Sequence, residues 1–335
     1  MRLIEPLTLS FGARAAAMVA AGVALPFGDG GAFAVARLFD DRRLVGVVRA
    51  GDLAADWVDV AARLIGGREW AGMAALPAVM GILNVTPDSF SDGGIDDSVA
   101  ASVARGLAMV EAGAAIIDIG GESTRPGAAE MPVQQELDRL LPVIEGLRGC
   151  GAKISVDTRH AKVMRSVLMA GADIINDVAA LAHELDAAET VAELNAPVVL
   201  MHMRGDPSSM ERLGHYDDVA VDVTEELALR IDMAERAGVA RHNIMVDPGV
   251  GFAKNAALSM ELLNRMAILA NLGCPILLGA SRKRFVGQYT EAARPEARLG
   301  GSVAAALAGV ARGARVVRVH DVAETVQALR LWEAL

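Results

Sequence analysis

From Pro77 to the end of the chain, short aliphatic runs alternate with longer alanine-rich stretches. The runs are rich in Val, Ile and Leu at consecutive positions, which is typical of parallel strands that are covered on both faces by helices. Each run ends in polar residues, glycine or proline, where a chain can turn. The pattern predicts eight strands, at 79–85, 115–119, 153–156, 173–176, 197–201, 243–246, 275–278 and 315–319.

The stretches between these runs repeat apolar residues at the spacing of an amphipathic helix. Helices are predicted at 98–113, 133–147, 161–170, 216–237, 302–312 and 322–332. Eight such β/α units match the number and size of a TIM barrel, so we predict an α/β fold of the (β/α)8 class over residues 77–335. A doubly wound parallel sheet is the alternative.

Residues 1–76 lack this alternation, and we predict that they form an N-terminal extension of unknown role. Their pattern suggests a strand at 44–48 and a helix at 54–64. The alanine-rich segment 15–26 is either a weak signal-peptide core or an amphipathic helix in a small extra domain. The helix is favoured, because the acidic Glu5 precedes this segment.

Composition and charge narrow the class of protein. The chain has 335 residues, 53% of them hydrophobic, and can therefore bury a large core. Its net charge of -10 and its dispersed arginines argue against a nucleic-acid partner. No apolar segment approaches the ~20 residues of a membrane span, so no membrane partner is expected. The separated Cys150 and Cys274 favour a reducing, cytoplasmic compartment, and no Cys/His set suggests a transition metal.

Polar side chains end or closely follow every predicted strand. In a TIM barrel the carboxyl ends of all strands meet at one mouth, where catalytic residues gather. Helix capping explains any single polar residue after a strand, but it does not explain one after each strand. The set comprises Asn84, Asp118, Asp157, Asn176, His202, Asp247, Ser281 with Lys283, and Arg318 with His320.

Three of these residues suit a planar heterocycle. An aspartate such as Asp157 or Asp247 accepts two hydrogen bonds from an amidine-like edge, while Asn176 can both donate and accept. That chemistry fits a 2-amino-4-oxo heterocycle and fits guanine-like rings equally well.

Cations follow the last two strands, in the sequences SRKR at 281–284 and RVH at 318–320. Many TIM barrels bind phosphate in the loops after strands seven and eight, so these residues indicate an anion site. A salt-bridged surface cluster is the alternative. The segment GGESTRPG at 120–127 predicts a mobile loop in which Arg125 closes over an anion, or else a plain turn with a surface arginine.

Asn84 ends the first strand of the predicted barrel, and its amide oxygen is a hard donor that suits Mg²⁺. Mg²⁺ commonly keeps several waters and takes its other ligands from phosphates. An ion at this position would neutralise a diphosphate leaving group.

These segments together resemble dihydropteroate synthase, the pterin-binding TIM-barrel family of folate biosynthesis. The resemblance rests on LNVTPDSFSDGG (83–94), GGESTRPG, SVDT, IND, MHMRG, DPGVGF, GASRK and RVHDV, which follow one another in the family order. It implies a transferase that joins 6-hydroxymethyl-7,8-dihydropterin diphosphate to 4-aminobenzoate, giving 7,8-dihydropteroate and diphosphate. It also implies Mg²⁺ as cofactor and a homodimer, for which the face with Val303, Leu307 and Val310 is a candidate.

The resemblance implies a role for each matching residue. Asn84 would ligate Mg²⁺, and Arg318 with His320 would hold the diphosphate. Two loops would close over the site: Phe90, Ser91 and Asp92 from the first, and Thr124 and Arg125 from the second. Asp92, Thr124, Arg125 and Lys283 are the residues expected to take part in catalysis. The pterin pocket would be lined by Asp118, Asp157, Asn176, Asp247, Phe252 and Lys283.

Two positions depart from the family pattern. Arg284 stands where the family commonly has a serine beside the aminobenzoate carboxylate, although a cation can still pair with that group. Ala253 replaces a glycine. Two other functions stay open: a pterin-binding methyltransferase domain that serves a corrinoid protein, and a catalytically idle relative.

Overall fold

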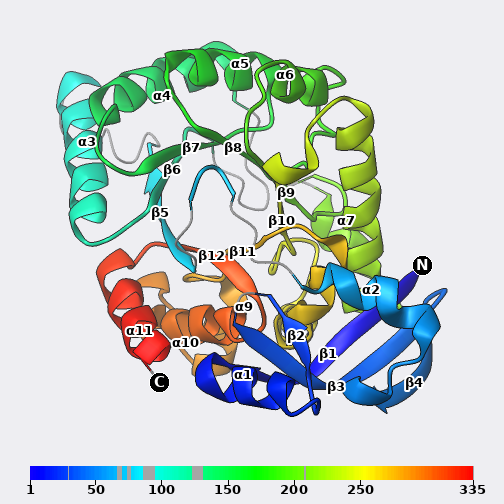
Figure 1. Ribbon diagram of the computed structural model, residues 1–335. Coiled ribbons are helices and arrows are strands. Elements are labelled where there is room, and N and C mark those ends of the chain that lie inside the picture. Colours follow the sequence, from blue (N-terminus) through cyan, green and yellow to red (C-terminus); the bar gives the residue numbers. More distant parts are fainter. Residues whose placement is uncertain are drawn as a thin grey trace.

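A closed barrel of eight parallel strands lies at the centre of the chain, and helices surround it (Figure 1). The computed structural model describes residues 1–28, 30–65, 70–73, 77–85, 95–122, 131–206 and 209–334, apart from the side chains of 95–98 and 211. The strands pair in the order β10-β11-β12-β5-β6-β7-β8-β9 and then close on β10. The predicted (β/α)8 TIM barrel is confirmed.

The barrel strands begin and end within one residue of the predicted positions. Their long aliphatic runs leave little ambiguity, because both faces of each strand are buried. The strands are β5 (Ala78–Asn84), β6 (Ile116–Gly120), β7 (Lys153–Asp157), β8 (Ile174–Asp177), β9 (Val198–Met201), β10 (Ile244–Asp247), β11 (Ile276–Leu278) and β12 (Ala314–Val319).

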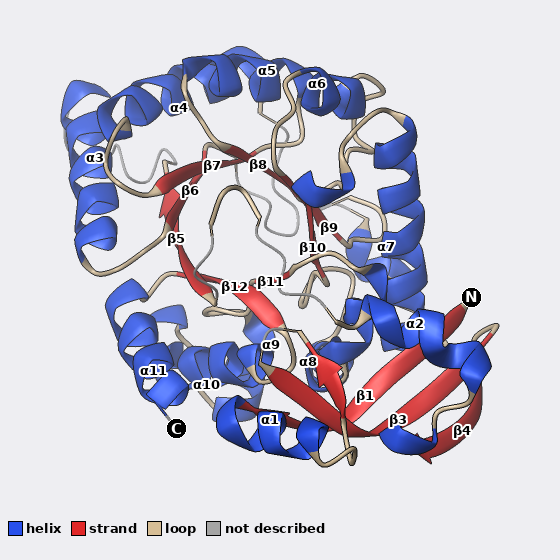
Figure 2. Cartoon of the chain, viewed as in Figure 1, coloured by secondary structure: helices blue, strands red, loops and turns tan. Residues whose placement is uncertain are grey.

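Helices form the outer layer of the barrel (Figure 2). Those at 187–193, 256–264 and 284–290 are short and were not predicted. The helices are α3 (Ile95–Glu111), α4 (Val133–Leu147), α5 (Ala161–Ala170), α6 (Ala187–Glu193), α7 (Val219–Arg236), α8 (Ala256–Asn264), α9 (Arg284–Thr290), α10 (Leu299–Val310) and α11 (Val322–Ala334). In the described ranges, none of the helices has the length and apolar character needed to cross a membrane.

One end of the barrel interior is filled by apolar side chains. Trp70, which precedes the first barrel strand and is 1% exposed, packs there, and its Nε1 donates to the Asn243 carbonyl at 3.0 Å. Two positions further along several strands, the inward side chains become polar, which marks the opposite end as the mouth. The apolar partners of Trp70 are Ala78, Met80, Ile116, Ile174, Val199, Met245, Leu277 and Val316.

The first 49 residues form a four-stranded antiparallel sheet with the helix α1, and the helix α2 follows the sheet. The predicted strand at 44–48 corresponds to β4, and the predicted helix at 54–64 contains α2. The helix α1 covers the first part of the alanine-rich segment, which continues into β2. The strands β1 and β3 were not predicted. The elements are β1 (Arg2–Phe11), α1 (Gly12–Ala20), β2 (Leu25–Phe27), β3 (Gly31–Asp40), β4 (Arg43–Arg49) and α2 (Val58–Arg63).

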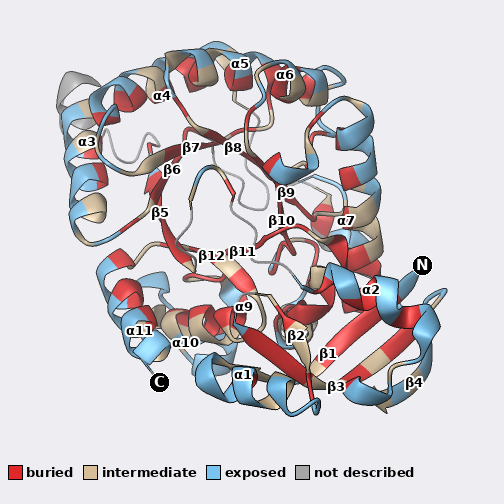
Figure 3. Ribbon diagram, in the orientation of Figure 1, coloured by how far each residue is buried: buried red, intermediate tan, exposed pale blue. Residues whose placement is uncertain are grey.

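This sheet is fixed to the barrel by buried polar contacts. Asn271 lies in a 3₁₀ helix after α8, and its side chain exchanges hydrogen bonds with the backbone of Ile4 at 2.7 and 3.0 Å. The Arg265 guanidinium donates two 3.0 Å bonds to Glu5, which is 1% exposed. Arg265 also pairs with Asp218, at the start of α7. Figure 3 shows the buried strands β1 and β3 beside the barrel.

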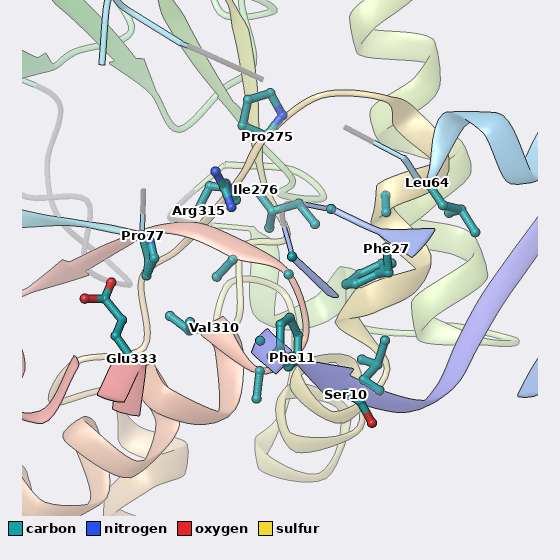
Figure 4. Close-up of a pocket in the computed structure, with 18 of the residues that line it drawn as sticks. Ser10, Phe11, Phe27, Leu64, Pro77, Pro275, Ile276, Val310, Arg315 and Glu333 are labelled. Atoms are coloured by element: carbon teal, nitrogen blue, oxygen red, sulfur yellow. The ribbon is translucent and has the colours of Figure 1, made fainter. Parts of the chain in front are cut away.

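A cavity of about 800 Å³ lies between the sheet and the barrel (Figure 4). Phe11 and Phe27 of the sheet line it together with Ile276 and Arg315 of the barrel. These barrel residues lie at the amino ends of β11 and β12, so the cavity is at the end opposite the polar mouth. It is therefore separate from the candidate site.

Candidate active site

Asp118 is the centre of a buried hydrogen-bond network at the mouth. This aspartate of β6 is 0% exposed, and it accepts bonds from side chains of three other strands, β7, β8 and β12. Ser155 Oγ donates to its Oδ1 at 2.6 Å, while Asn176 Nδ2 and Arg318 Nε donate to its Oδ2 at 3.0 and 2.6 Å. A buried carboxylate needs such donors, because an unpaired charge in this position is costly. The network fixes the orientation of Asn176 and Arg318.

Asp157 ends β7 on the other side of Arg318, whose Nη2 donates to Asp157 Oδ2 at 2.9 Å. Burial raises the pKa of Asp157 to about 7; the Arg318 charge opposes this rise and the Asp118 charge adds to it. The pKa of Asp157 is therefore higher than that of an ordinary surface carboxylate.

Asp247 and Lys283 form the second half of the mouth. Asp247 Oδ1 accepts a 2.7 Å bond from the Gly249 amide, which orients the carboxylate. A side chain at Gly279 would place a Cβ 3.7 Å from Asp247 Oδ2 and 3.9 Å from Lys283 Nζ. Gly279 thus leaves open the space between this carboxylate and this amine. Burial lowers the pKa of Lys283 to about 8, although the Asp247 charge acts in the opposite direction.

Phe252 lies beside this pair, with its ring centroid 4.6 Å from Lys283 Nζ. Lys283 also donates to the Val250 carbonyl at 2.6 Å, so the loop after β10 and the loop after β11 are joined. The predicted pocket residues Asp118, Asp157 and Asn176 belong to the first network, while Asp247, Phe252 and Lys283 form this second group.

Lys254 stabilises the loop that follows β10. Its Nζ donates to the carbonyls of Gly249 and Phe252 at 3.1 and 2.9 Å and to His202 Nδ1 at 2.9 Å. The other nitrogen of His202, Nε2, consequently carries the proton and donates to Glu226 Oε2 at 2.9 Å. Burial, followed by the Lys254 charge, lowers the pKa of His202 to about 4. His202 is therefore neutral at physiological pH, and its contacts with Lys254 and Glu226 give it a structural role.

The residues after β11 and β12 divide into two groups. Ser281 Oγ lies 3.0 Å from His320 Nδ1, so these two side chains are together near the mouth. Arg282 instead pairs with Asp321, its Nε lying 3.1 Å from Asp321 Oδ2. The salt-bridge alternative is thus correct for Arg282. Arg284 is exposed at the first position of α9.

Asn84, the predicted Mg²⁺ ligand, is exposed at the end of β5. Gly120 leaves space beside it, because a Cβ there would lie 3.4 Å from Asn84 Oδ1 and 3.8 Å from Asp157 Cβ. The Asn84 side-chain oxygen is an amide oxygen, a hard donor that fits Mg²⁺ better than a transition metal.

The two predicted loops lie partly or wholly outside the described residues. This applies to Phe90, Ser91, Asp92, Thr124 and Arg125. Their proposed roles therefore stay predictions.

The base of the second loop is described, and it is firmly held. Glu122 accepts bonds from Arg159 at 3.1 and 3.3 Å, and Arg139 donates to the Gly121 carbonyl at 3.0 Å. These contacts fix the point from which the loop leaves β6.

Sequence reasoning missed three residues that shape the mouth: Ser155, Lys254 and Gly279. Ser155 lies two residues before Asp157, and the alternation of a strand places both on the inner face. Lys254 lies two residues after the motif DPGVGF, and its burial was not foreseen. The role of Gly279 depends on side chains from other strands, and no local pattern reveals it.

Comparison with known proteins agrees with this geometry. A family described as "Pterin binding enzyme" matches residues 80–320. Dihydropteroate synthase of Escherichia coli K12 is 47% identical over 259 residues, which is 77% of this chain and 91% of that protein. The acidic, amide and cationic side chains described at the mouth thus belong to a barrel of the pterin-binding family.

Two solved structures of Xanthomonas albilineans dihydropteroate synthase are also similar. The one with 4-aminobenzoic acid has a TM-score of 0.73 and 51% identity, covering 77% of this chain and 93% of that chain. The one in complex with 7,8-dihydropteroate has a TM-score of 0.70 and 48% identity, with the same coverage. The chain belongs to the dihydropteroate synthase family of pterin-binding enzymes.

Proposed function

We infer that this protein is a dihydropteroate synthase, a transferase that condenses 6-hydroxymethyl-7,8-dihydropterin diphosphate with 4-aminobenzoate. The observation that carries this conclusion is the group of Asp247, Lys283 and Asn176 at the mouth of a barrel whose relatives are synthases. The relatives bound to 4-aminobenzoic acid and to 7,8-dihydropteroate support both substrate classes. The methyltransferase alternative is not favoured.

The pterin ring binds between the two halves of the mouth. Asp247 accepts two hydrogen bonds from the amidine-like edge of the ring, because its carboxylate is held by the Gly249 amide. Asn176, oriented by Asp118, donates to or accepts from the opposite edge. Lys283 contributes a donor near Asp247, and Phe252 supplies an apolar wall.

The reaction replaces a C–O bond at the exocyclic carbon of the pterin with a C–N bond. Diphosphate leaves with the bonding electron pair, and the clamped ring stabilises the positive charge that develops on the carbon. The amine lone pair of 4-aminobenzoate then forms the new bond, and a proton leaves the nitrogen. Since an arylamine is a weak nucleophile, most of the rate enhancement comes from assisting departure and excluding water.

Mg²⁺ is the proposed cofactor, and Asn84 is its proposed protein ligand. A bound Mg²⁺ would neutralise charge on the diphosphate. Arg318 and His320 are the proposed partners of the diphosphate oxygens. Arg318 is already oriented by Asp118 and Asp157, so its position does not depend on the substrate.

The second substrate is proposed to bind nearer the rim. Arg284 is exposed at the start of α9, one residue after Lys283, where its cation can pair with the aminobenzoate carboxylate. Asp92, Thr124 and Arg125 are the proposed catalytic loop residues, and their loops are proposed to cover the site and exclude water.

We also propose a cytoplasmic homodimer. The two cysteines, Cys150 and Cys274, lie far apart in the sequence and outside any CxxC pattern, which supports a reducing compartment. Of the residues on the candidate dimer face, Val310 is 4% exposed and packs in the subunit's own core, so it is available only for intrasubunit contacts. Val303 and Leu307 are partly buried and stay the candidate contacts. A solution-scattering mass of one chain would refute the dimer.

The N-terminal sheet is proposed to be a structural unit that stabilises the barrel. Trp70 lies in the barrel interior, so a deletion of residues 1–76 would remove part of the barrel core as well as the sheet. Deleting only residues 1–64 and assaying the remaining protein tests the role of the sheet by itself.

One assay tests the function. The protein is incubated with the pterin diphosphate, 4-aminobenzoate and Mg²⁺, and both products are measured. Equal amounts of diphosphate and 7,8-dihydropteroate are expected. Pterin binding without product would identify a catalytically idle relative, and methyl transfer to a corrinoid protein would identify a methyltransferase; either result would overturn the proposal.

A further inference from the structure

A second cluster of potential ligands lies outside the pterin site, between the loops that follow β7 and β8. His160 immediately precedes α5, while His183 and Glu184 precede α6. One potential ligand atom from each of the three side chains lies within 4.8 Å of the other two. The strands β7 and β8 and the helices α5 and α6 are neighbours in Figure 1. The three residues therefore belong to one small region.

Two of the three side chains are already held in place. His160 is 4% exposed, and its Nδ1 lies 2.8 Å from Glu184 Oε1. The other oxygen of Glu184, Oε2, accepts a 2.7 Å bond from the Ala161 amide. A carboxylate fixed by a backbone donor in this way resembles the ligands of protein metal sites, whose orientation depends on outer hydrogen bonds.

His183 completes the set from an exposed position. Its ring centroid lies 5.0 Å from that of His160, with the ring planes at 76°. The loop that carries it is anchored by Asp177, which accepts 2.7 Å bonds from the Ala179 and Leu181 amides. Both imidazoles and the carboxylate therefore come from well-supported loops, and His183 is the most exposed of the three side chains.

We propose that His160, His183 and Glu184 bind a divalent first-row transition ion such as Zn²⁺. Two imidazoles and one carboxylate form a three-residue ligand set for Zn²⁺, which takes water as its fourth ligand. Bonds of about 2.1 Å place ligand atoms about 3–3.5 Å apart, within the 4.8 Å limit of this cluster. Binding therefore requires the ligand atoms to come together to that separation, and His183 is the most exposed of the three side chains.

This site differs in chemistry from the one proposed at Asn84. Mg²⁺ prefers oxygen ligands, whereas imidazole nitrogen favours Zn²⁺, Co²⁺ and Ni²⁺. An ion at the cluster would join the loops that follow Asp157 and Asn176, the residues that end β7 and line β8. The proposal does not depend on the synthase activity.

Calorimetric titration of the metal-free full-length protein with ZnCl2, in excess Mg²⁺, tests the site. One Zn²⁺ per chain is expected. His183→Asn and Glu184→Gln should each weaken binding at least tenfold, about the loss expected when a metal site is disturbed. Both substitutions should preserve the fold, because His183 is exposed and Gln keeps an oxygen for the Ala161 amide.

His215→Asn is the matched control, because His215 is an exposed histidine in another loop, with a side chain 92% accessible. Its Zn²⁺ affinity should equal that of the unmodified protein. Circular dichroism checks that each variant is folded. No saturable uptake by the unmodified protein, or equal affinity in the His183 variant, would overturn the proposal.

Discussion

Arg318 Nε lies 2.6 Å from Asp118 Oδ2, so the eighth strand of the barrel is joined to the second across the first. The same guanidinium reaches Asp157 on the third strand at 2.9 Å. One arginine therefore orients two carboxylates, and Asp118 in turn orients Asn176. The half of the mouth that contains Asp118, Asp157 and Asn176 is organised before any substrate arrives, which lowers the cost of ordering it on binding.

Asp118→Asn should destabilise the protein by about 3 kcal/mol, because it removes a buried negative charge from its pair with Arg318. Asp157 still pairs with Arg318, so the loss stays at the lower end of the range that is usual when one partner of a buried ion pair is removed. Urea unfolding measures the change. Glu193→Gln is the control, since its exposed pair with Arg165 should contribute less than about 1 kcal/mol. Equal effects of the two substitutions would contradict the network.

Asp157 should make stability depend on pH between about 4 and 7. Its folded pKa is raised from 3.8 to about 7, mainly by burial, so folding favours the protonated form. That contribution is complete below pH 3.8 and is lost as pH rises through 7. Urea unfolding at several pH values should show the unmodified protein losing about 1 kcal/mol per pH unit relative to Asp157→Asn. Parallel pH curves for the two proteins would contradict this account.

Glu5→Gln tests how the N-terminal sheet is held. The substitution leaves Arg265 without its buried carboxylate partner, and we expect a loss of about 3 kcal/mol in the free energy of unfolding. Asp40→Asn removes an exposed partner of Arg2 in the same sheet and should cost less than about 1 kcal/mol. If the two variants unfold alike, the sheet is held by its apolar contacts instead.

Arg284→Ser restores the residue that the family commonly has at this position. Because the arginine is exposed, its pair with the aminobenzoate carboxylate should contribute no more than about 1 kcal/mol. Steady-state kinetics should therefore show KM for 4-aminobenzoate rising up to about fivefold, with kcat unchanged. The KM for the pterin diphosphate is the internal control. A lower KM for 4-aminobenzoate would show that the arginine hinders this substrate.

The barrel could be predicted from sequence, and the N-terminal sheet could not. The strands of the barrel are aliphatic on both faces, so their identity does not depend on their partners. The strand β3, GAFAVARLFD, mixes alanine, arginine and large apolar residues, and its pattern fits a helix and a strand equally well. Its conformation is decided by pairing with β1 and β4 and by packing on the barrel.

Within the site, the positions of residues were easier to predict than their contacts. Asp118, Asp157, Asn176 and Asp247 follow from strand ends, because a parallel barrel brings these ends together. The sequence did not show whether Arg282 pairs with Asp321 or belongs to an anion site. In either case an arginine follows a strand. His160 and Glu184 are 24 residues apart, and only the adjacency of two loops brings them together.

The central claim is tested most directly by steady-state formation of 7,8-dihydropteroate by the unmodified protein and by Asp247→Asn. We expect the unmodified protein to release one diphosphate for each dihydropteroate formed. The substitution should lower kcat/KM by about 100-fold, because it replaces the carboxylate that binds the ring edge. Circular dichroism checks that the variant keeps its fold. Activity equal to that of the unmodified protein, or no dihydropteroate from a protein that binds the pterin, would contradict the account.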